Sequence, residues 1–208
     1  MRNFDKIYER KSWGEEGNGS GTGSMLHTTV SVRNFITDLI QNQGVRKIVD
    51  VSVGGMTWWP EVLDQFPEVE FFGYDISLIK TKENKEKFRE KSNWKFYFAD
   101  LVSKKDYPDC DLIICRHTLN HLSKEDVLKS IDNLKQVNYR FLGITQHAVN
   151  EIDIQKDIQS DTPGCIDYRP INLSEEPIGM PSPIMEVDDA DAEDVQMNWQ
   201  RKFSIWVK

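Results

Sequence analysis

The sequence predicts a doubly wound, Rossmann-like α/β fold, with a seven-stranded, mostly parallel sheet whose last strand is antiparallel. Apolar stretches typical of buried strands alternate with segments of helical periodicity, a pattern typical of parallel strands joined by right-handed crossovers. Two strand-like segments with no clear helix between them end the chain, so we expect them to pair antiparallel at one sheet edge. The 208 residues suit a single domain over 1–208 with one sizeable core.

The expected elements follow from local patterns along the chain. Apolar residues recur at helical spacing over 30–41, and Gly44 ends that helix. Ser123, followed by an acidic first turn, begins another helix. The remaining helices are expected at 58–66 and, capped by Ser77, at 77–91. Strands are expected at 45–51, 69–75, 94–98, 111–115, 139–145, 184–187 and 202–207.

Three segments stand apart from this alternation. Residues 14–24 are rich in glycine, and composition alone favours a flexible linker over a ligand-covering loop. Prolines spread through 161–183 predict an irregular segment. The acidic run Asp188–Asp194 lacks the ligand spacing of a calcium loop, so we expect a solvated loop there.

Charge and cysteine content argue against several classes of protein. The net charge of −8 repels phosphate backbones, so no nucleic-acid partner is expected. Cys110, Cys115 and Cys165 lack the spacing of a zinc site or a disulfide scaffold. No apolar stretch approaches a membrane span, and the first residues show no secretory pattern. We therefore expect a cytoplasmic protein with no membrane partner, while the oligomeric state stays open.

The residues that follow each expected strand are the candidate ligand contacts, because open α/β sheets bind ligands at the carboxyl ends of their strands. Gly54 and Gly55 follow the first strand and allow close backbone approach. Asp75 ends the second strand, where an acid can bind ribose hydroxyls or cap a helix. Asp100 and Leu101 follow the third and could hold an adenine amino group and ring. The pattern predicts an adenosine site without a phosphate loop; a dinucleotide enzyme is a less favoured alternative, since no clean GxGxxG is present.

The stretch Asp50–Trp58 (D-V-S-V-G-G-M-T-W) resembles the D-x-P-C-G-D-F-x-W motif of a subgroup of class I S-adenosylmethionine-dependent methyltransferases. The resemblance extends over nearly the whole chain. Further matching stretches are 4–24, Y-D-I-S at 74–77, C-R-H-T-L-N-H-L-S at 115–123 (usually R-D-x-L-x-H-L-S), 168–173 and 177–183. Three positions depart from the pattern: Ser52 stands at the first motif glycine, Gly55 where an acid is usual, and His117 in place of the fourth-strand acid.

The resemblance implies a class I methyltransferase fold, S-adenosylmethionine as the cofactor, an N-terminal cofactor lid over 1–28 instead of a linker, and a substrate loop over 161–187. It implies cofactor contacts from Trp13, Gly23, Ser24, Asp50, Ser52, Gly54, Gly55, Trp58, Asp75, Ile76, Asp100, Leu101 and Arg116. Members of this subgroup are often found among glycan-building enzymes. A sugar or glycan hydroxyl, with a deoxysugar such as rhamnose as the first choice, is therefore the implied acceptor. The chain could equally be a domain of a larger glycan-building protein.

The histidines are the candidate catalytic groups, because methyl transfer to a hydroxyl benefits from a base and histidine titrates near neutral pH. We expect His117 to be the base, with His121 or His147 as second choices, and activity to rise with pH through the imidazole range. The groups expected to orient the acceptor are Arg116, Gln146, His147, Tyr168 and Arg169. His117 and His121 have HxxxH spacing, but no third ligand is evident, so no metal is expected.

Three alternatives stay open at this point. The first is a domain that binds the cofactor without catalysis, motivated by Ser52 and Met56 in the glycine turn. The second is a methyltransferase acting on protein or on another small molecule. The third is a nicotinamide-dependent oxidoreductase.

Overall fold

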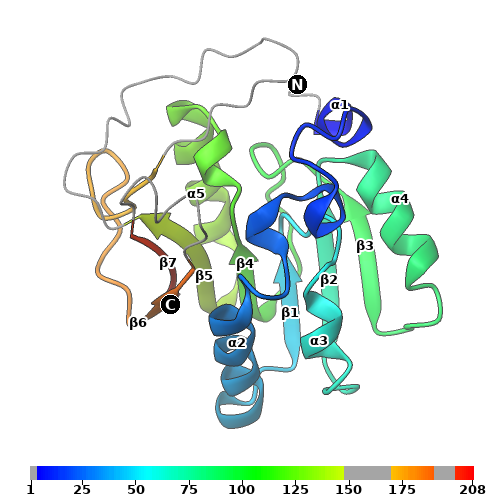
Figure 1. The fold of residues 1–208 in the computed structure, drawn as a ribbon. Helices are drawn as coiled ribbons and strands as arrows, with labels where there is room; N and C mark the ends of the chain where they lie inside the picture. Colours follow the sequence, from blue (N-terminus) through cyan, green and yellow to red (C-terminus); the bar gives the residue numbers. More distant parts are fainter. Residues whose placement is uncertain (1–3, 148–169, 190–199) are drawn as a thin grey trace.

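The computed structural model describes residues 4–147, 170–189 and 200–208 and shows one twisted sheet flanked by helices (Figure 1). The strands are β1 (Lys47–Asp50), β2 (Glu70–Asp75), β3 (Trp94–Phe98), β4 (Cys110–Cys115), β5 (Tyr139–His147), β6 (Met185–Asp188) and β7 (Arg201–Val207). Their order in the sheet is β3-β2-β1-β4-β5-β7-β6. Strands β1 to β5 are parallel, and β7 runs antiparallel to both β5 and β6. The expected seven-stranded, mostly parallel sheet is confirmed.

Helices cover both faces of this sheet. The helical elements are α1 (Phe4–Glu9), η1 (Glu16–Gly19), η2 (Thr22–Ser24), α2 (Val30–Gln43), α3 (Trp59–Leu63), α4 (Leu78–Lys87), η3 (Leu119–His121) and α5 (Lys124–Gln136). Helices α2 and α3 pack on one face and α5 on the other, while α4 packs along β2 and β3. None of the helices within the described ranges has the length and apolar character needed to cross a membrane.

Successive residues of the central strands serve opposite layers of the core. Ile48 and Leu112 pack with α2 and α3, whereas Val49 and Ile113 pack with α5, as strand geometry requires. All four side chains are 0% exposed. Burial on both faces explains why these strands are near-continuous apolar runs in the sequence.

The helix ends follow the sequence signals. Gly44 ends α2 in the left-handed conformation with φ of 68°, which glycine adopts without steric cost. The side chains of Ser77 and Ser123 each accept the backbone N–H three residues further on, so both expected caps are confirmed.

The strict alternation of strand and helix breaks between β3 and β4, where residues 99–109 form a connection without a helix. Helices α3 and α4 are also shorter than the expected 58–66 and 77–91. Phe88 follows the last residue of α4, and its ring packs against the rings of Trp94 and Phe96 in β3.

One residue of the acidic run, Asp189, is buried, which corrects the expectation of a solvated loop at that position. Asp188 ends β6 with an exposed side chain, but Asp189 is only 1% exposed. Because β6 is antiparallel to β7 and β7 is antiparallel to β5, β6 ends at the same edge as β1 to β5. Asp189 therefore reaches the sheet edge where ligands bind. Residues 190–194 of the run lie outside the described residues.

Candidate functional site

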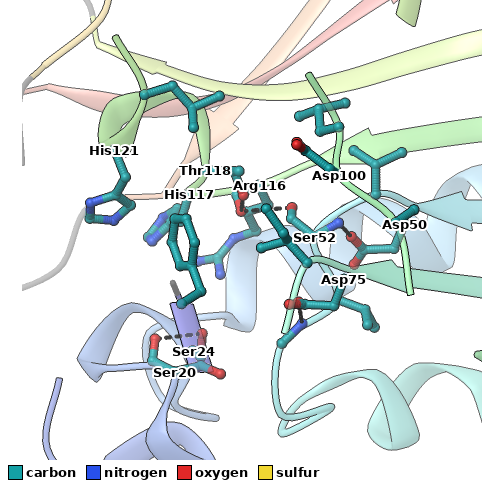
Figure 2. Close-up of a pocket in the computed structure, with 18 of the residues that line it drawn as sticks. Ser20, Ser24, Asp50, Ser52, Asp75, Asp100, Arg116, His117, Thr118 and His121 are labelled. Atoms are coloured by element: carbon teal, nitrogen blue, oxygen red, sulfur yellow. Dashed lines mark hydrogen bonds between the residues drawn. The ribbon is translucent and has the colours of Figure 1, made fainter. Parts of the chain in front are cut away.

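A pocket lies at the carboxyl edge of the sheet, between the ends of β1 to β4 and residues 4–28, which we call the lid (Figure 2). The empty space within it, open solvent included, is about 850 Å³. The expected contacts that line it are Trp13, Ser24, Asp50, Ser52, Gly54, Trp58, Asp75, Ile76, Asp100, Leu101, Arg116, His117 and His121. The structure thus gathers residues from four strand ends and the lid around one cavity.

The two glycines after β1 leave room for the lid to pack closely against their backbone. A Cβ on Gly54 would lie 2.7 Å from Ser20 Oγ, and one on Gly55 would lie 2.7 Å from Asn18 Cβ. Asn18 Nδ2 donates to the Gly55 carbonyl over 2.8 Å, and the Gly55 N–H donates to Ser20 Oγ over 2.9 Å. Close backbone approach was expected toward a ligand. Gly54 does line the pocket, whereas Gly55 serves the lid.

Asp75 ends β2 and joins the glycine turn to the start of α4. Its Oδ2 accepts the Gly54 N–H over 2.8 Å, and its Oδ1 accepts the Ser77 N–H over 2.7 Å. Burial raises the pKa of Asp75 to about 6, although both backbone hydrogen bonds act to lower it. Asp75 therefore supports the start of α4 and faces the pocket as well, so the two readings of this residue are compatible.

Asp50 ends β1 and is more deeply enclosed. Its Oδ1 accepts the Ser52 N–H over 2.9 Å, and its Oδ2 accepts the indole N–H of Trp59 over 2.7 Å. Burial raises the pKa of Asp50 to about 7, against the lowering effect of these two hydrogen bonds. The Trp59 ring stacks on Trp58 at 4.3 Å between centroids, so the two tryptophans fix both the carboxylate and one wall of the pocket.

Asp100 follows β3 beside an apolar wall. Its Oδ1 accepts the Val102 N–H over 3.0 Å. The apolar residues that line the same pocket include Val51, Ile76, Ala99, Leu101 and Val102. A carboxylate offers about four acceptor sites, so Asp75 and Asp100 keep acceptor capacity for hydroxyl or amino groups. Carboxylates beside an apolar slot fit a nucleoside.

Arg116 and His117 follow β4 and meet Asp189 from the far edge of the sheet. Arg116 donates through Nε and Nη2 to Asp189 Oδ1, and through Nη2 to the carbonyl of Gly23 in the lid over 2.8 Å. His117 Nε2 lies 3.1 Å from Asp189 Oδ2. Gly23 is thus an expected contact that acts through Arg116 instead of lining the pocket.

His117 sits in a strained and poorly solvated position. Its φ is 53°, a left-handed conformation that non-glycine residues adopt at a cost, often at functional sites. Burial, together with the charges of Arg116 and Arg201, holds the pKa of His117 well below its ordinary value, against the raising effect of Asp189. This lowered pKa runs against the expected rise of activity with pH through the imidazole range.

The second histidine of the motif, His121, also lines the pocket. The rings of His121 and Trp13 are 5.3 Å apart between centroids, and both line the cavity. Figure 2 shows His117 and His121 on the same segment after β4. Across the described ranges, no group of three His, Cys, Asp or Glu side chains is placed to hold a metal ion.

Gln146 and His147 on β5 do not line the pocket. Gln146 Nε2 donates to Ser204 Oγ and Glu186 Oε1, and its Oε1 accepts the Leu173 N–H. His147 Nδ1 accepts the Ile171 N–H over 3.2 Å. Both side chains anchor residues 170–180 to the sheet, so the structure does not bring them to the candidate acceptor groups. Tyr168 and Arg169 lie outside the described residues.

Several lining residues lie within the stretches that carry the motif resemblance but were not selected individually from the sequence. They are Phe4, Tyr8, Ser20, Val53, Thr118 and Leu122. The lid residues among them could be found only by accepting the lid as part of the site. Asp189, which touches the site through Arg116 and His117, was hidden within a charged run.

The sequence matches no protein-family profile and no curated protein. Solved structures share the fold. The methyltransferase domain of bacterial CtHen1-CN matches with a TM-score of 0.51 and 11% identity, over 58% of this chain and 67% of that one. An O-methyltransferase family protein from Burkholderia thailandensis matches with a TM-score of 0.50 and 13% identity, over 62% of this chain and 40% of that one. PKMT2 from Rickettsia typhi, solved in complex with AdoHcy, matches with a TM-score of 0.46 and 15% identity, over 51% of this chain and 22% of that one.

These matches concern the fold. The sheet order and the antiparallel β7 are those of the class I methyltransferase fold. This chain spans less than half the length of the first two structures that match it by fold, 22% and 45%.

Proposed function

We propose that the protein is an S-adenosylmethionine-dependent methyltransferase and that the pocket holds this cofactor. The observation that carries the proposal is the set of carboxylates Asp50, Asp75 and Asp100, which end or follow three adjacent strands around an apolar slot beneath the lid. Asp75 would bind the ribose hydroxyls and Asp100 the adenine amino group. When bound, the cofactor would supply a methyl group activated by its sulfonium sulfur. The fold shared with methyltransferases supports this assignment.

The proposed acceptor is a hydroxyl of a sugar or glycan, with a deoxysugar such as rhamnose as the first choice. The motif resemblance supports it, and so does the composition of the pocket near β4. Arg116, His117 and His121 offer polar groups there, and the Trp13 ring offers an apolar face. Polar hydrogen-bonding groups beside an aromatic ring suit a polyhydroxylated ring.

The proposed mechanism needs no metal. A methyl group on a sulfonium needs no further activation, so the protein mainly positions the acceptor and removes its proton. His117 is the proposed base, because it lines the pocket directly after β4 and contacts the Asp189 carboxylate. A base of this kind contributes about 10²–10⁴-fold to the rate.

Calorimetry tests the cofactor assignment. The full chain should bind S-adenosylmethionine and its demethylated product, and Asp75→Ala should weaken binding by about 1–3 kcal/mol through lost hydrogen bonds. Asp132→Ala, an exposed acid on α5, is the matched control and should bind normally. Binding of a nicotinamide dinucleotide in place of the sulfonium cofactor would favour an oxidoreductase. Mass spectrometry of rhamnose-containing glycans incubated with isotope-labelled cofactor then tests the acceptor.

One observation favours a second candidate, a binding module without catalysis. The backbone N–H groups of this turn donate hydrogen bonds within the protein: Ser52 to Asp50, Gly54 to Asp75 and Gly55 to Ser20. Cofactor binding without turnover on glycan, small-molecule and protein acceptors would support that candidate. Turnover on a protein or on another small molecule would instead support methyltransferase activity and contradict the proposed sugar acceptor.

A further inference from the structure

The carboxylate of Asp189 is fully enclosed by hydrogen-bond donors. Its side chain is 0% exposed. Oδ1 accepts from Arg116 Nε at 3.1 Å and Nη2 at 2.5 Å, and Oδ2 accepts from Thr145 Oγ1 at 2.9 Å. Oδ2 also lies 3.1 Å from His117 Nε2. These four partners fill the roughly four acceptor sites of a carboxylate.

Asp189 is ionised in this setting. Burial by itself would raise its pKa, but the charges of Arg116 and Arg201 and the contact with His117 outweigh burial and hold the pKa well below its ordinary value. Arg201 also donates to the Asp189 backbone carbonyl over 2.6 Å. An ionised carboxylate only accepts hydrogen bonds, so the proton between Asp189 and His117 belongs to His117 Nε2.

The other ring nitrogen of His117, Nδ1, is then the one that carries no proton. A neutral imidazole carries one proton, so Nδ1 holds a lone pair when Nε2 is protonated. His117 lines the pocket, and within the described part of the chain its Nδ1 has no hydrogen-bond partner.

We infer that Asp189 is a positioning residue that fixes the proton of His117 on Nε2 and so presents Nδ1 to the acceptor as the base. The inference rests on the proposed methyl transfer. In that step the acceptor O–H bond breaks and its proton moves to Nδ1, while the oxygen electron pair forms the bond to the methyl carbon. The electron pair of the broken bond to sulfur stays on sulfur. Asp189, next to the Nε2 proton, stabilises the imidazolium that results.

Asparagine at this position should reverse the tautomer. Arg116 has donors only, so the amide oxygen of Asn must stay on the Arg116 side. The amide NH₂ then faces His117 Nε2, which has to accept, and the ring proton moves to Nδ1. The lone pair is thereby removed from the pocket without removing a side chain.

The wild-type tautomer is measured directly by long-range ¹H–¹⁵N NMR on the labelled full chain. The protein has four histidines, and His117→Gln assigns the signal of interest. We expect a neutral His117 protonated at Nε2 between pH 6 and 8. A wild-type ring protonated at Nδ1 overturns the inference, and this result does not depend on activity.

Two variants provide a second, independent test. Asp189→Asn should move the proton to Nδ1 and lower turnover, by about 10⁴-fold if it follows the same exchange in serine proteases, with unchanged cofactor affinity. Asp188→Asn is the matched control, since its neighbouring carboxylate is 76% exposed and pairs with Lys202; it should match wild type in tautomer and rate. Wild-type turnover in Asp189→Asn contradicts the inference. Failure of the wild type to bind S-adenosylmethionine contradicts the proposed function instead and leaves the tautomer result to be judged by itself.

Discussion

Replacing Gly55 with alanine should loosen the lid and weaken cofactor binding. Gly55 lies outside the left-handed region, so alanine fits its backbone, but the new Cβ would lie 2.7 Å from Asn18 Cβ and 2.9 Å from the Asn18 carbonyl oxygen. Contacts that short force Asn18 to move. The Asn18 to Gly55 hydrogen bond is then lost, together with the neighbouring bond from Gly55 N–H to Ser20 Oγ.

The size of the effect follows from those two bonds. Each neutral hydrogen bond contributes about 0.5–1.5 kcal/mol, so lid docking should lose about 1–3 kcal/mol. If the lid closes over the cofactor, that loss corresponds to a dissociation constant raised by about 5–150-fold. Global stability should fall by less than this, because alanine also restricts the unfolded chain at this position.

Hydrogen exchange of the lid amides and calorimetry with S-adenosylmethionine measure the two consequences. Ser20→Ala removes one of the bonds without a clash and should give a smaller effect in the same direction, while Ser92→Ala, on the exposed turn before β3, serves as the control. Wild-type lid exchange and wild-type affinity in Gly55→Ala would refute the view that this glycine exists to seat the lid.

Three further predictions concern the acids, the base and metals. Asp50 and Asp75 hold their protons more tightly in the folded protein, with pKa values of about 7 and 6 against an ordinary 3.8, so the stability of the ligand-free protein should fall as pH rises from about 4 to 7. Urea denaturation across this range checks the trend, and Asp50→Asn should flatten it. His117→Ala should lower turnover by about 10²–10⁴-fold with unchanged cofactor affinity, and the wild-type rate should show no imidazole step between pH 6 and 8; a larger loss in His121→Ala would move the base to His121. Activity should survive EDTA, and a loss restored by magnesium would contradict the metal-free mechanism.

The fold and half of the site could be predicted because they depend on local pattern and strand order. Asp50, Asp75 and Asp100 each end or follow a strand, and parallel strands bring their carboxyl ends to one edge. The composition of 14–24 favoured a linker. Only the motif resemblance predicted a cofactor lid in this segment, and in the structure its Asn18 and Ser20 contact the distant glycine turn.

Gln146 and His147 show where strand-end reasoning stops. They belong to a ligand-edge strand, but their polar atoms hold residues 170–180. Whether a strand-end side chain faces the cavity or a neighbouring segment depends on what packs beside it. The residues next to it in the sequence do not determine that packing.

By itself, the sequence determined the alternating α/β architecture, the antiparallel end of the sheet, the caps of α4 and α5, and the strand-end carboxylates. Only the tertiary structure decided the fate of Asp189. In the sequence it is one acid among many in a charged run, and local charge cannot distinguish a solvated carboxylate from a buried one. Asp189 is 72 positions from His117 in the chain. Because β6 and β7 extend the sheet beside β5, its Oδ2 nevertheless lies 3.1 Å from His117 Nε2. There Arg116, Thr145 and His117 replace its water, because a buried charge is stable only when donors surround it.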